Sequence, residues 1–190
     1  MAGYYKMPEQ THTAIDSEGW LHTGDLAMMN AQGSLIIVGR LKEMVIRGEN
    51  IFPREVEEFL LRLPKVADVC VVGVPDAFFG EELLAVVRPK EGADVTEQDL
   101  REFYKRKVSH QKIPRYFQFV DAYPLTASGK VQKFVLREQA IQALGLQEIA
   151  NSKQDTERLL NEMTAVYEDC LRSPEHAAVR ADLKAHEKTT

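Results

Sequence analysis

The feature that most constrains the fold of this chain is residues 39–57, which read GRLKEMVIRGENIFPREVE. Before this stretch the sequence has short strand-like runs and turn residues, and after it helical and strand patterns alternate. Residues 43–47 are strand-like and residues 48–50 are turn residues. Pro53 stands where its fixed φ suits the first residue of a helix. The stretch therefore predicts a hairpin that leads into a helix, at the boundary between two differently built parts of the chain.

The segment that follows predicts one compact domain with alternating helices and strands. Apolar residues with helical spacing, or a capping signal at Thr96 and Asp99, indicate three helices: residues 53–63, the segment after Thr96, and 131–144. Apolar runs indicate three strands: residues 66–74, 83–88 and 116–120. The order helix–strand–strand–helix–strand–helix predicts an α+β domain over residues 39–145, with a three-stranded sheet and helices.

The two ends of the chain carry weaker patterns. Residues 1–38 predict a hairpin between 26–29 and 35–38, but they are too few to close a core and indicate the edge of something larger. Residues 146–190 are charged and lack strand signals, and they predict a helical tail. Within this tail the amphipathic helix spans residues 155–172, and a second, weaker helix is expected over 175–186.

Composition and cysteine usage exclude several classes of protein. The formal net charge of −5 argues against nucleic-acid binding, which needs a basic surface. No apolar run approaches the roughly 18 residues of a membrane span, and the N-terminus lacks the pattern of a signal peptide. Cys70 lies in an apolar run and is expected to be a buried thiol, so a reduced, cytoplasmic protein is predicted. The five histidines lack metal-ligand spacing, so we expect no metal held by protein side chains alone.

Two short segments have side chains that suit binding of an anion or a sugar. Asp25 follows Gly24 at the end of a strand-like run, where a carboxylate can accept hydrogen bonds from vicinal hydroxyls. Its alternative is a turn carboxylate that bonds its own backbone. Lys130 follows Ser-Gly in the loop 124–130 before a helix, and it could meet a phosphate or carboxylate there. Its alternative is a solvated turn lysine.

Further cations gather at two other places. Arg40 and Lys42 lie at the boundary of the two halves, either as ligands of an anion or as solvated surface charges. A basic patch near the end of the second helix could receive a polyphosphate. Its members are Lys105, Arg106, Lys107, Lys112 and Arg115. The alternative is that these cations complement the negative end of the helix dipole.

Four spaced segments together resemble a known family. They are GWLHTGDLA (19–27), GRLKEMVIRGENIFPREVE (39–57), GVPDAFFGE (73–81) and PLTASGKVQK (124–133). In this order they resemble the C-terminal signatures of the AMP-forming acyl-CoA synthetases of the adenylate-forming superfamily, with fatty-acyl-CoA ligases as the nearest type. The resemblance implies a ligase that activates a carboxylic acid with ATP to acyl-AMP and then forms the CoA thioester. It implies ATP/AMP and coenzyme A as ligands, with Mg²⁺ accompanying ATP and no Mg²⁺ ligands expected in this chain.

The resemblance also implies roles for single residues. Asp25 and Arg40 match the pair that binds the ribose hydroxyls of AMP. Lys42, within a hinge at 40–42, matches the residue about which the C-terminal lid domain rotates between the two half-reactions. Lys130 matches the catalytic lysine that bridges the acyl carboxylate and the α-phosphate during adenylation. Rotation of the lid is expected to replace Lys130 with the Gly48 hairpin at the reacting centre.

The remaining expected contacts concern coenzyme A. Phe79 matches an aromatic position near the CoA nucleotide, and Lys112 and Arg115 are expected to meet its phosphates. Two positions depart from the usual pattern of the family. The hairpin has one glycine, Gly48, where two are usual, which predicts a changed turn type or register. Gln111 stands where a flat aromatic residue is often found.

The resemblance covers residues 3–145 and leaves out the large N-terminal domain of such enzymes. We therefore expect a C-terminal fragment, in which residues 1–38 are terminal strands of the absent large domain and the isolated chain is inactive. The alternative is a non-catalytic remnant or interaction module that docks on a protein partner through the helix 155–172. A peptide-synthetase adenylation end is less favoured, because no carrier-domain serine motif follows Gly145.

Overall fold

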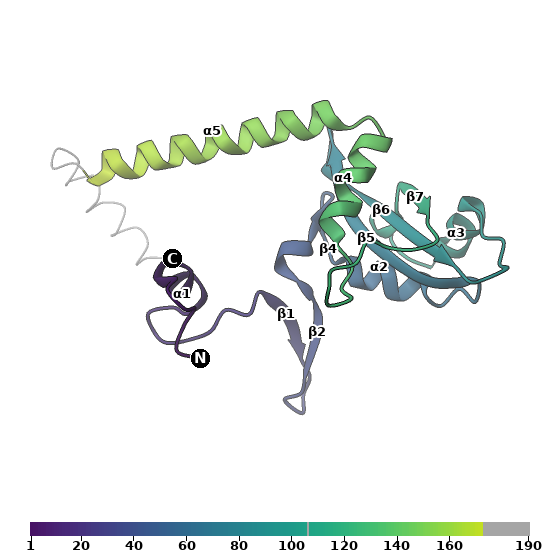
Figure 1. Ribbon diagram of the computed structural model, residues 1–190, viewed down its shortest axis with the longest axis horizontal. Helices are drawn as coiled ribbons and strands as arrows, with labels where there is room; N and C mark the ends of the chain where they lie inside the picture. The colour runs from purple at the N-terminus through teal and green to yellow at the C-terminus, as the bar shows by residue number, and fades with distance from the viewer. Residues whose placement is uncertain (106, 173–190) are drawn as a thin grey trace. The chain divides into compact units, whose positions relative to one another are not determined.

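The computed structural model describes residues 1–105 and 107–172, with the side chains of the final helix described as far as residue 165. The chain divides into two compact units, residues 1–144 and residues 145–190. Figure 1 labels the elements of both units, and each unit is described by itself below. The expected weak helix over 175–186 lies outside the described residues.

The centre of the first unit is a three-stranded sheet with strand order β5-β6-β7. Strands β5 (Val66–Asp76) and β6 (Gly80–Pro89) form a long antiparallel hairpin, and β7 (Tyr116–Phe119) pairs parallel with β6. The three predicted strands are therefore present, although β5 and β6 extend further toward their shared turn than the apolar runs suggested. The reason is that ladder hydrogen bonds continue through the polar residues beside the turn, where hydrophobicity gives no signal.

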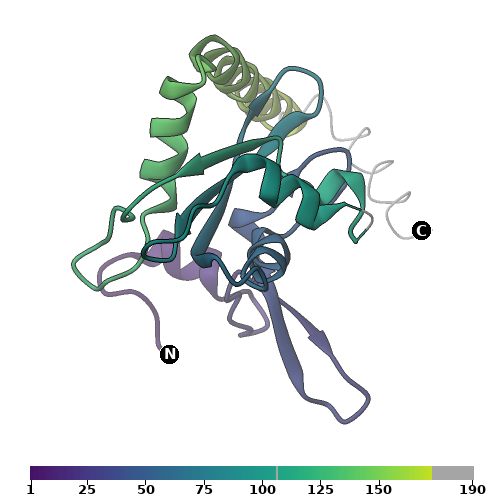
Figure 2. The same ribbon diagram turned by 90° about the vertical axis from the view of Figure 1, so that its right-hand side faces the viewer.

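Both faces of the sheet are covered by helices, as Figure 2 shows. Side chains of α2 (Pro53–Leu60) and α3 (Glu97–Tyr104) join one face in a single buried cluster. Its largest members include Leu60, Leu83, Leu100 and Tyr104. Strand side chains alternate between faces, and a second buried set lies outside that cluster: Val72, Leu84 and Val86, with Leu136 and Ala140 of α4 (Lys133–Ala143). The α+β class predicted from the sequence is confirmed.

Helices α2 and α3 begin where the sequence signals predicted, whereas α4 begins at Lys133, two residues after its predicted start at 131. Pro53 is in the first turn of α2. The capping box of α3 is complete, because Thr96 Oγ1 accepts from the Asp99 N–H at 3.2 Å and Asp99 accepts from the Thr96 N–H at 3.0 Å. The α2 helix ends at Leu60, three residues before the predicted end, and a turn leads into β5.

The predicted hairpin before α2 is present as β3 (Val45–Ile46) and β4 (Asn50–Ile51). It follows the 3-10 helix η1 (Leu41–Glu43). Its turn is closed by a hydrogen bond from the Arg47 N–H to the Glu49 carbonyl at 3.0 Å, with Gly48 at a φ of +72°. Because Val45 and Ile51 are buried in the core, the short turn is anchored to the lid domain at its base.

Residues 1–44 contain elements but no buried residue. The predicted hairpin is present as β1 (Asp25–Met29) and β2 (Leu35–Arg40). The strand-like run expected just before Asp25 is not a strand, and only an isolated bridge between Ile15 and Leu21 is present there. A short helix, α1 (Pro8–Ala14), was not predicted, because its seven residues carry no apolar stripe.

The second unit contains the long helix α5 (Gln147–Arg172). It begins eight residues before the predicted start, after Gly145 with a φ of +67° has ended the preceding helix. Leu159, Leu160 and Met163 are exposed on it. The remaining apolar side chains of the predicted stripe, Val166, Tyr167, Cys170 and Leu171, lie outside the described side chains. None of the helices in the described residues has the length and apolar character needed to cross a membrane.

Candidate functional site

The two residues predicted to meet a ribose lie opposite each other on the β1–β2 hairpin. Asp25 and Arg40 are register partners, and the Arg40 Nε lies 3.0 Å from the Asp25 Oδ1. The Asp25 N–H donates to the Thr23 Oγ1 at 3.1 Å, and the half-buried Asp25 carboxylate pairs with the exposed Arg40. A carboxylate that accepts and a guanidinium that donates, side by side, can engage two neighbouring hydroxyl groups.

The predicted hinge follows this pair directly. Lys42 is exposed within η1, and the Leu41 N–H donates to the Gly24 carbonyl at 2.9 Å. This bond ties the start of η1 to the strand that carries Asp25. Residues 40–42 therefore lie between an uncovered hairpin and the first buried strand of the lid domain, which begins at Val45.

Lys130 is presented by a tight loop. An isolated bridge joins Leu125 and Val131, and the Thr126 N–H donates to the Lys130 carbonyl at 2.8 Å. In return the Lys130 N–H donates to the Thr126 Oγ1 at 3.1 Å. The side chain of Lys130 is exposed, and its Nζ has no hydrogen-bond or ion-pair partner in the part of the chain that the structure describes. The loop thus holds the backbone of Lys130 while leaving its ammonium available.

Lys133, three residues further on, has the opposite environment and was not singled out from the sequence. Its Nζ lies 2.7 Å from the Glu43 Oε2 and 3.2 Å from the Glu57 Oε1, and Glu57 also accepts from the Val71 N–H. Burial opposes the charge on Lys133, but the two carboxylates outweigh it and raise its pKa. The pair with Glu43 links the start of α4 to the residue that follows the hinge. No sequence signal indicates a pair between residues 90 positions apart.

Cys70 lies near this ion cluster and is buried, as the sequence predicted. Burial raises the pKa of its thiol to about 12. The thiol is therefore neutral at physiological pH and inert as a nucleophile. Among the residues that the structure describes, no group of three or more histidine, cysteine, aspartate or glutamate side chains could hold a metal ion.

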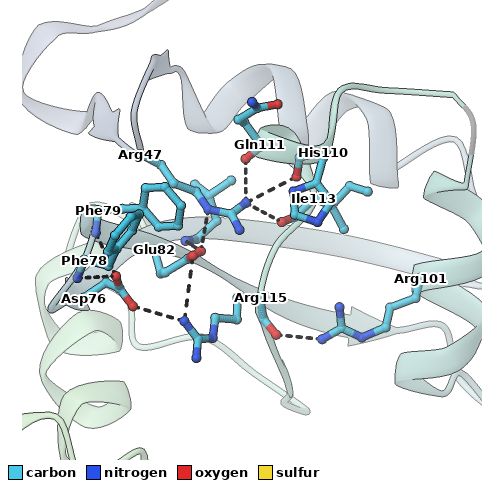
Figure 3. Close-up of polar contacts among 11 residues, drawn as sticks. Arg47, Asp76, Phe78, Phe79, Glu82, Arg101, His110, Gln111, Ile113 and Arg115 are labelled. Atoms are coloured by element: carbon cyan, nitrogen blue, oxygen red, sulfur yellow. Dashed lines mark hydrogen bonds and ion pairs between the residues drawn. The ribbon is translucent and has the colours of Figure 1, made fainter.

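A second charged cluster, drawn in Figure 3, centres on Arg47. The Arg47 Nε lies 2.8 Å from the Glu82 Oε2, and the two residues are only 7% and 1% exposed. Its Nη1 donates to three carbonyls of one segment: His110 at 3.3 Å, Gln111 at 2.8 Å and Ile113 at 3.0 Å. The sequence did not indicate this cluster, because Arg47 stands at the end of a strand-like run beside a turn, where a surface residue is the ordinary expectation.

The same cluster contains the predicted CoA residues Phe79 and Arg115. Arg115 Nη1 lies 3.1 Å from the Asp76 Oδ2 and 4.0 Å from the Glu82 Oε1. Asp76 accepts from the N–H groups of Phe79 and Phe78, both at 2.9 Å. These bonds, with the nearby cations, lower the pKa of Asp76. The Phe79 ring lies 5.7 Å from the Arg47 Cζ, beside the Gly48 turn.

The described cations of the predicted basic patch each contact a partner of their own. Lys112, in η2 (His110–Lys112), pairs with Glu55 of α2 at 2.7 Å. Lys105, which directly follows α3, pairs with Glu102 at 3.2 Å, and Lys107 lies over the Phe103 ring at 4.2 Å. Arg106 lies outside the described residues. The described cations of the patch are therefore partly neutralised. Among them, Lys112 lies on the segment 110–113 that Arg47 holds, and Arg115 follows that segment.

Comparison with known proteins identifies the relatives of this arrangement. Residues 55–130 match a family model described as the AMP-binding enzyme C-terminal domain. The chain is 54% identical over 147 residues to the putative acyl-CoA synthetase YngI of Bacillus subtilis, covering 77% of this chain and 27% of that protein. It is 52% identical to the human mitochondrial medium-chain acyl-CoA ligase ACSF2, covering 77% of this chain and 24% of that protein. The chain thus matches about a quarter of the length of these curated relatives.

A solved structure has the same fold in the matched region. The ATP-bound MatB of Rhodopseudomonas palustris superposes with a TM-score of 0.69 at 38% identity. The match covers 73% of this chain and 28% of that one. Sequence and structure comparisons therefore agree on how much of the chain is matched.

Proposed function

Since this chain carries the C-terminal domain of the AMP-forming acyl-CoA synthetases, we propose that it is the lid of a ligase for carboxylic acids, with fatty acids as the substrate class. In the first half-reaction the acid attacks ATP, giving acyl-AMP and pyrophosphate. In the second, the thiol of CoA attacks the acyl carbon and AMP leaves. The observation that carries this proposal is the environment of Lys130, an exposed ammonium without a partner among the described residues on a hydrogen-bonded loop.

The chemistry of the first step explains why such a lysine is useful. A carboxylate oxygen forms a bond to the α-phosphorus while the bond to pyrophosphate breaks, so two anions must approach each other. A cation placed between them offsets their repulsion and stabilises the charge that develops in the transition state. Lys130 fits this role because its ammonium is not already neutralised within the described residues. Lys133 does not fit, because Glu43 and Glu57 hold it.

The other predicted residues would bind and orient the nucleotides. We propose that Asp25 and Arg40 together bind the ribose of AMP, and that Lys42 lies in the hinge about which the lid rotates. For coenzyme A, we propose that Phe79 and the Gly48 turn border the bound molecule. Lys112 and Arg115 would bind its phosphates in place of their present carboxylate partners. Breaking these ion pairs should cost little free energy, because the pairs lie at exposed or half-buried positions.

The reaction needs groups that this chain does not supply alone. We propose that ATP, with its Mg²⁺, and the acyl chain bind mainly to the part of such enzymes that this chain does not cover, and that the isolated chain is inactive. Among the described residues, the observation that supports the alternative role as an interaction module is the exposure of Leu159, Leu160 and Met163 on α5. The cytoplasmic location stays a prediction, and one relative is named as mitochondrial.

The test is a chimera in which this chain, in full, replaces the matching region of the Bacillus subtilis relative. Adenylation is measured as pyrophosphate release with a medium-chain fatty acid, and thioester formation as CoA consumption from preformed acyl-adenylate. We expect Lys130→Ala to slow adenylation by roughly 10²–10³, equivalent to about 3–4 kcal/mol, as for loss of one preorganised charge-stabilising donor. Thioester formation should be largely spared.

The matched control is Lys90→Ala, which removes another exposed lysine just after β6. It should change neither half-reaction. Equal losses in both half-reactions with Lys130→Ala would contradict the role of this lysine. A folded chimera that carries out neither half-reaction would overturn the proposed function as a whole.

A further inference from the structure

Arg47 connects three segments that are far apart in the sequence, as Figure 3 shows. Arg47 lies in the turn between β3 and β4, and its backbone forms an isolated bridge with Gly80 at the start of β6. Its guanidinium binds Glu82 of β6 and the carbonyls of the segment 110–113. It also lies against the Phe79 ring in the turn between β5 and β6. We call Arg47, Glu82 and these three carbonyls the Arg47 clamp.

The contacts of the clamp require the shape and the several donors of an arginine side chain. An arginine has five N–H donors in a rigid planar fork, and here they serve a carboxylate and three carbonyls at once. Lysine has one nitrogen and cannot reach this set from the same position. Because Arg47 and Glu82 are almost fully buried, each charge depends on the other for compensation. The three carbonyls would also lose a buried donor if Arg47 were removed.

The surfaces that the clamp joins are those assigned above to coenzyme A. The turn carries Gly48, which lies beside the Phe79 ring, and the clamped segment carries Lys112 and leads to Arg115. Neither Lys130 nor the Asp25–Arg40 pair has a hydrogen bond or ion pair with clamp residues in the described part of the chain. The clamp thus supports one face of the lid domain and leaves the groups assigned to adenylation outside it.

We propose that Arg47 is a positioning residue for the second half-reaction, in which it holds the Gly48 turn, the Phe79 ring and the segment 110–113 in the arrangement that receives coenzyme A. This inference rests on the proposed function. It also gives a role to the shortened turn. With one glycine, the turn is closed by the Arg47 N–H and anchored by the Arg47 side chain, so a single residue sets both its shape and its place.

The test uses the chimera described above and three variants. Arg47→Met alone leaves the buried Glu82 carboxylate with only the more distant Arg115, at 4.0 Å, as a cation and could unfold the domain. The double variant R47M/E82L removes both charges and keeps the volume apolar, a replacement that is often neutral or stabilising. R47K keeps the charge but not the fork. The control is Arg54→Met, which breaks the exposed pair of Arg54 with Glu58 on α2.

We expect R47M/E82L to remain folded and to adenylate the fatty acid at the parental rate. Its KM for CoA in the second half-reaction should rise about ten- to a hundredfold, because misplacement by about 1 Å has effects of that order. R47K should show a smaller rise in the same parameter. The Arg54→Met control should leave both half-reactions unchanged.

The outcomes separate this inference from the proposed function. If the parental chimera makes acyl-CoA, but R47M/E82L keeps the parental KM for CoA, Arg47 is not a positioning residue. Equal losses in both half-reactions at an unchanged melting temperature would also overturn the inference, because a role on the CoA face alone would not slow adenylation. If the parental chimera is itself inactive although folded, the proposed function fails before the clamp is tested.

Discussion

The two long hairpins of this chain have the same local geometry and opposite surroundings. Strands β5 and β6 form the centre of the lid domain and bury side chains on both faces. Strands β1 and β2 pair just as regularly over residues 25–40, yet none of their residues is buried. Ladder hydrogen bonds alone therefore do not distinguish a hairpin of the core from one that is proposed to bind a ribose. Burial distinguishes them, because it supplies most of the free energy that holds an element in place.

Each hairpin also carries one cross-strand pair of an aspartate with an arginine. On β1–β2 the pair is Asp25 and Arg40, and on β5–β6 it is Asp68 and Arg88. Both pairs lie on exposed or half-buried positions, so neither is expected to contribute much to folding. The difference lies in what is proposed for them. Only the pair on β1–β2 lies within a sequence segment that resembles a nucleotide-binding signature.

The largest expected effect compares the same substitution in the two hairpins. Leu83 of β6 is 0% exposed, whereas Leu35 of β2 is 68% exposed. Leu83→Ala should lower the free energy of unfolding by about 2–5 kcal/mol, because it removes buried methyl groups and leaves a cavity. Leu35→Ala should change it by less than about 0.5 kcal/mol. Urea denaturation of the chain measures both, and similar values would show that burial does not separate the hairpins.

An intermediate effect on the free energy of unfolding is expected from Lys133, which pairs with Glu43 beside the hinge. Lys133→Met leaves Glu43 and Glu57 without their cation and should cost about 1–3 kcal/mol at pH 7, between the values for exposed and fully buried pairs. Because the carboxylates raise the pKa of Lys133 above its ordinary value of 10.5, the contribution of Lys133 is fully present below pH 10.5. It is lost as the pH rises through the raised pKa.

The difference in unfolding free energy between wild type and Lys133→Met should thus be constant from pH 7 to 9 and shrink above 10.5. The matched control is Lys105→Met, which breaks an exposed pair with Glu102 and should cost less than about 0.5 kcal/mol. A difference that grew with pH would contradict the favourable pairing of Lys133 with its two carboxylates.

The smallest effect on folding is expected from the two cross-strand pairs. Arg40→Ala and Arg88→Ala should each change the free energy of unfolding by less than about 1 kcal/mol, because both pairs are exposed to solvent screening. In the chimera, only Arg40→Ala should raise the KM for ATP, by about tenfold, for loss of one charged hydrogen bond to the nucleotide. Equal KM values for the two variants would leave the β1–β2 pair without a special role.

Some candidate site residues could be proposed from the sequence because their signals are contiguous. Asp25, Arg40 and Lys130 each stand inside a segment that resembles a family signature, and the structure leaves all three accessible. Arg47 and Lys133 also stand inside such segments, but nothing in those segments indicates which residues they contact. Arg47 and Glu82 are 35 positions apart, and Lys133 and Glu43 are 90 positions apart. Charged residues in a sequence are ordinarily read as surface residues, and only packing shows that these are buried or paired.

Local sequence signals were enough to predict the order of the elements in the lid domain. They also predicted the helix starts at Pro53 and Thr96 and the helix stop before Gly145, because turn, cap and periodicity signals act between near neighbours. The environments of the charges depend instead on tertiary contacts: Lys130 is available while Lys133 is held, and Arg47 is buried where three segments meet. The physical reason is that the state of a charge depends on which distant carboxylates and carbonyls the fold brings within a few ångströms.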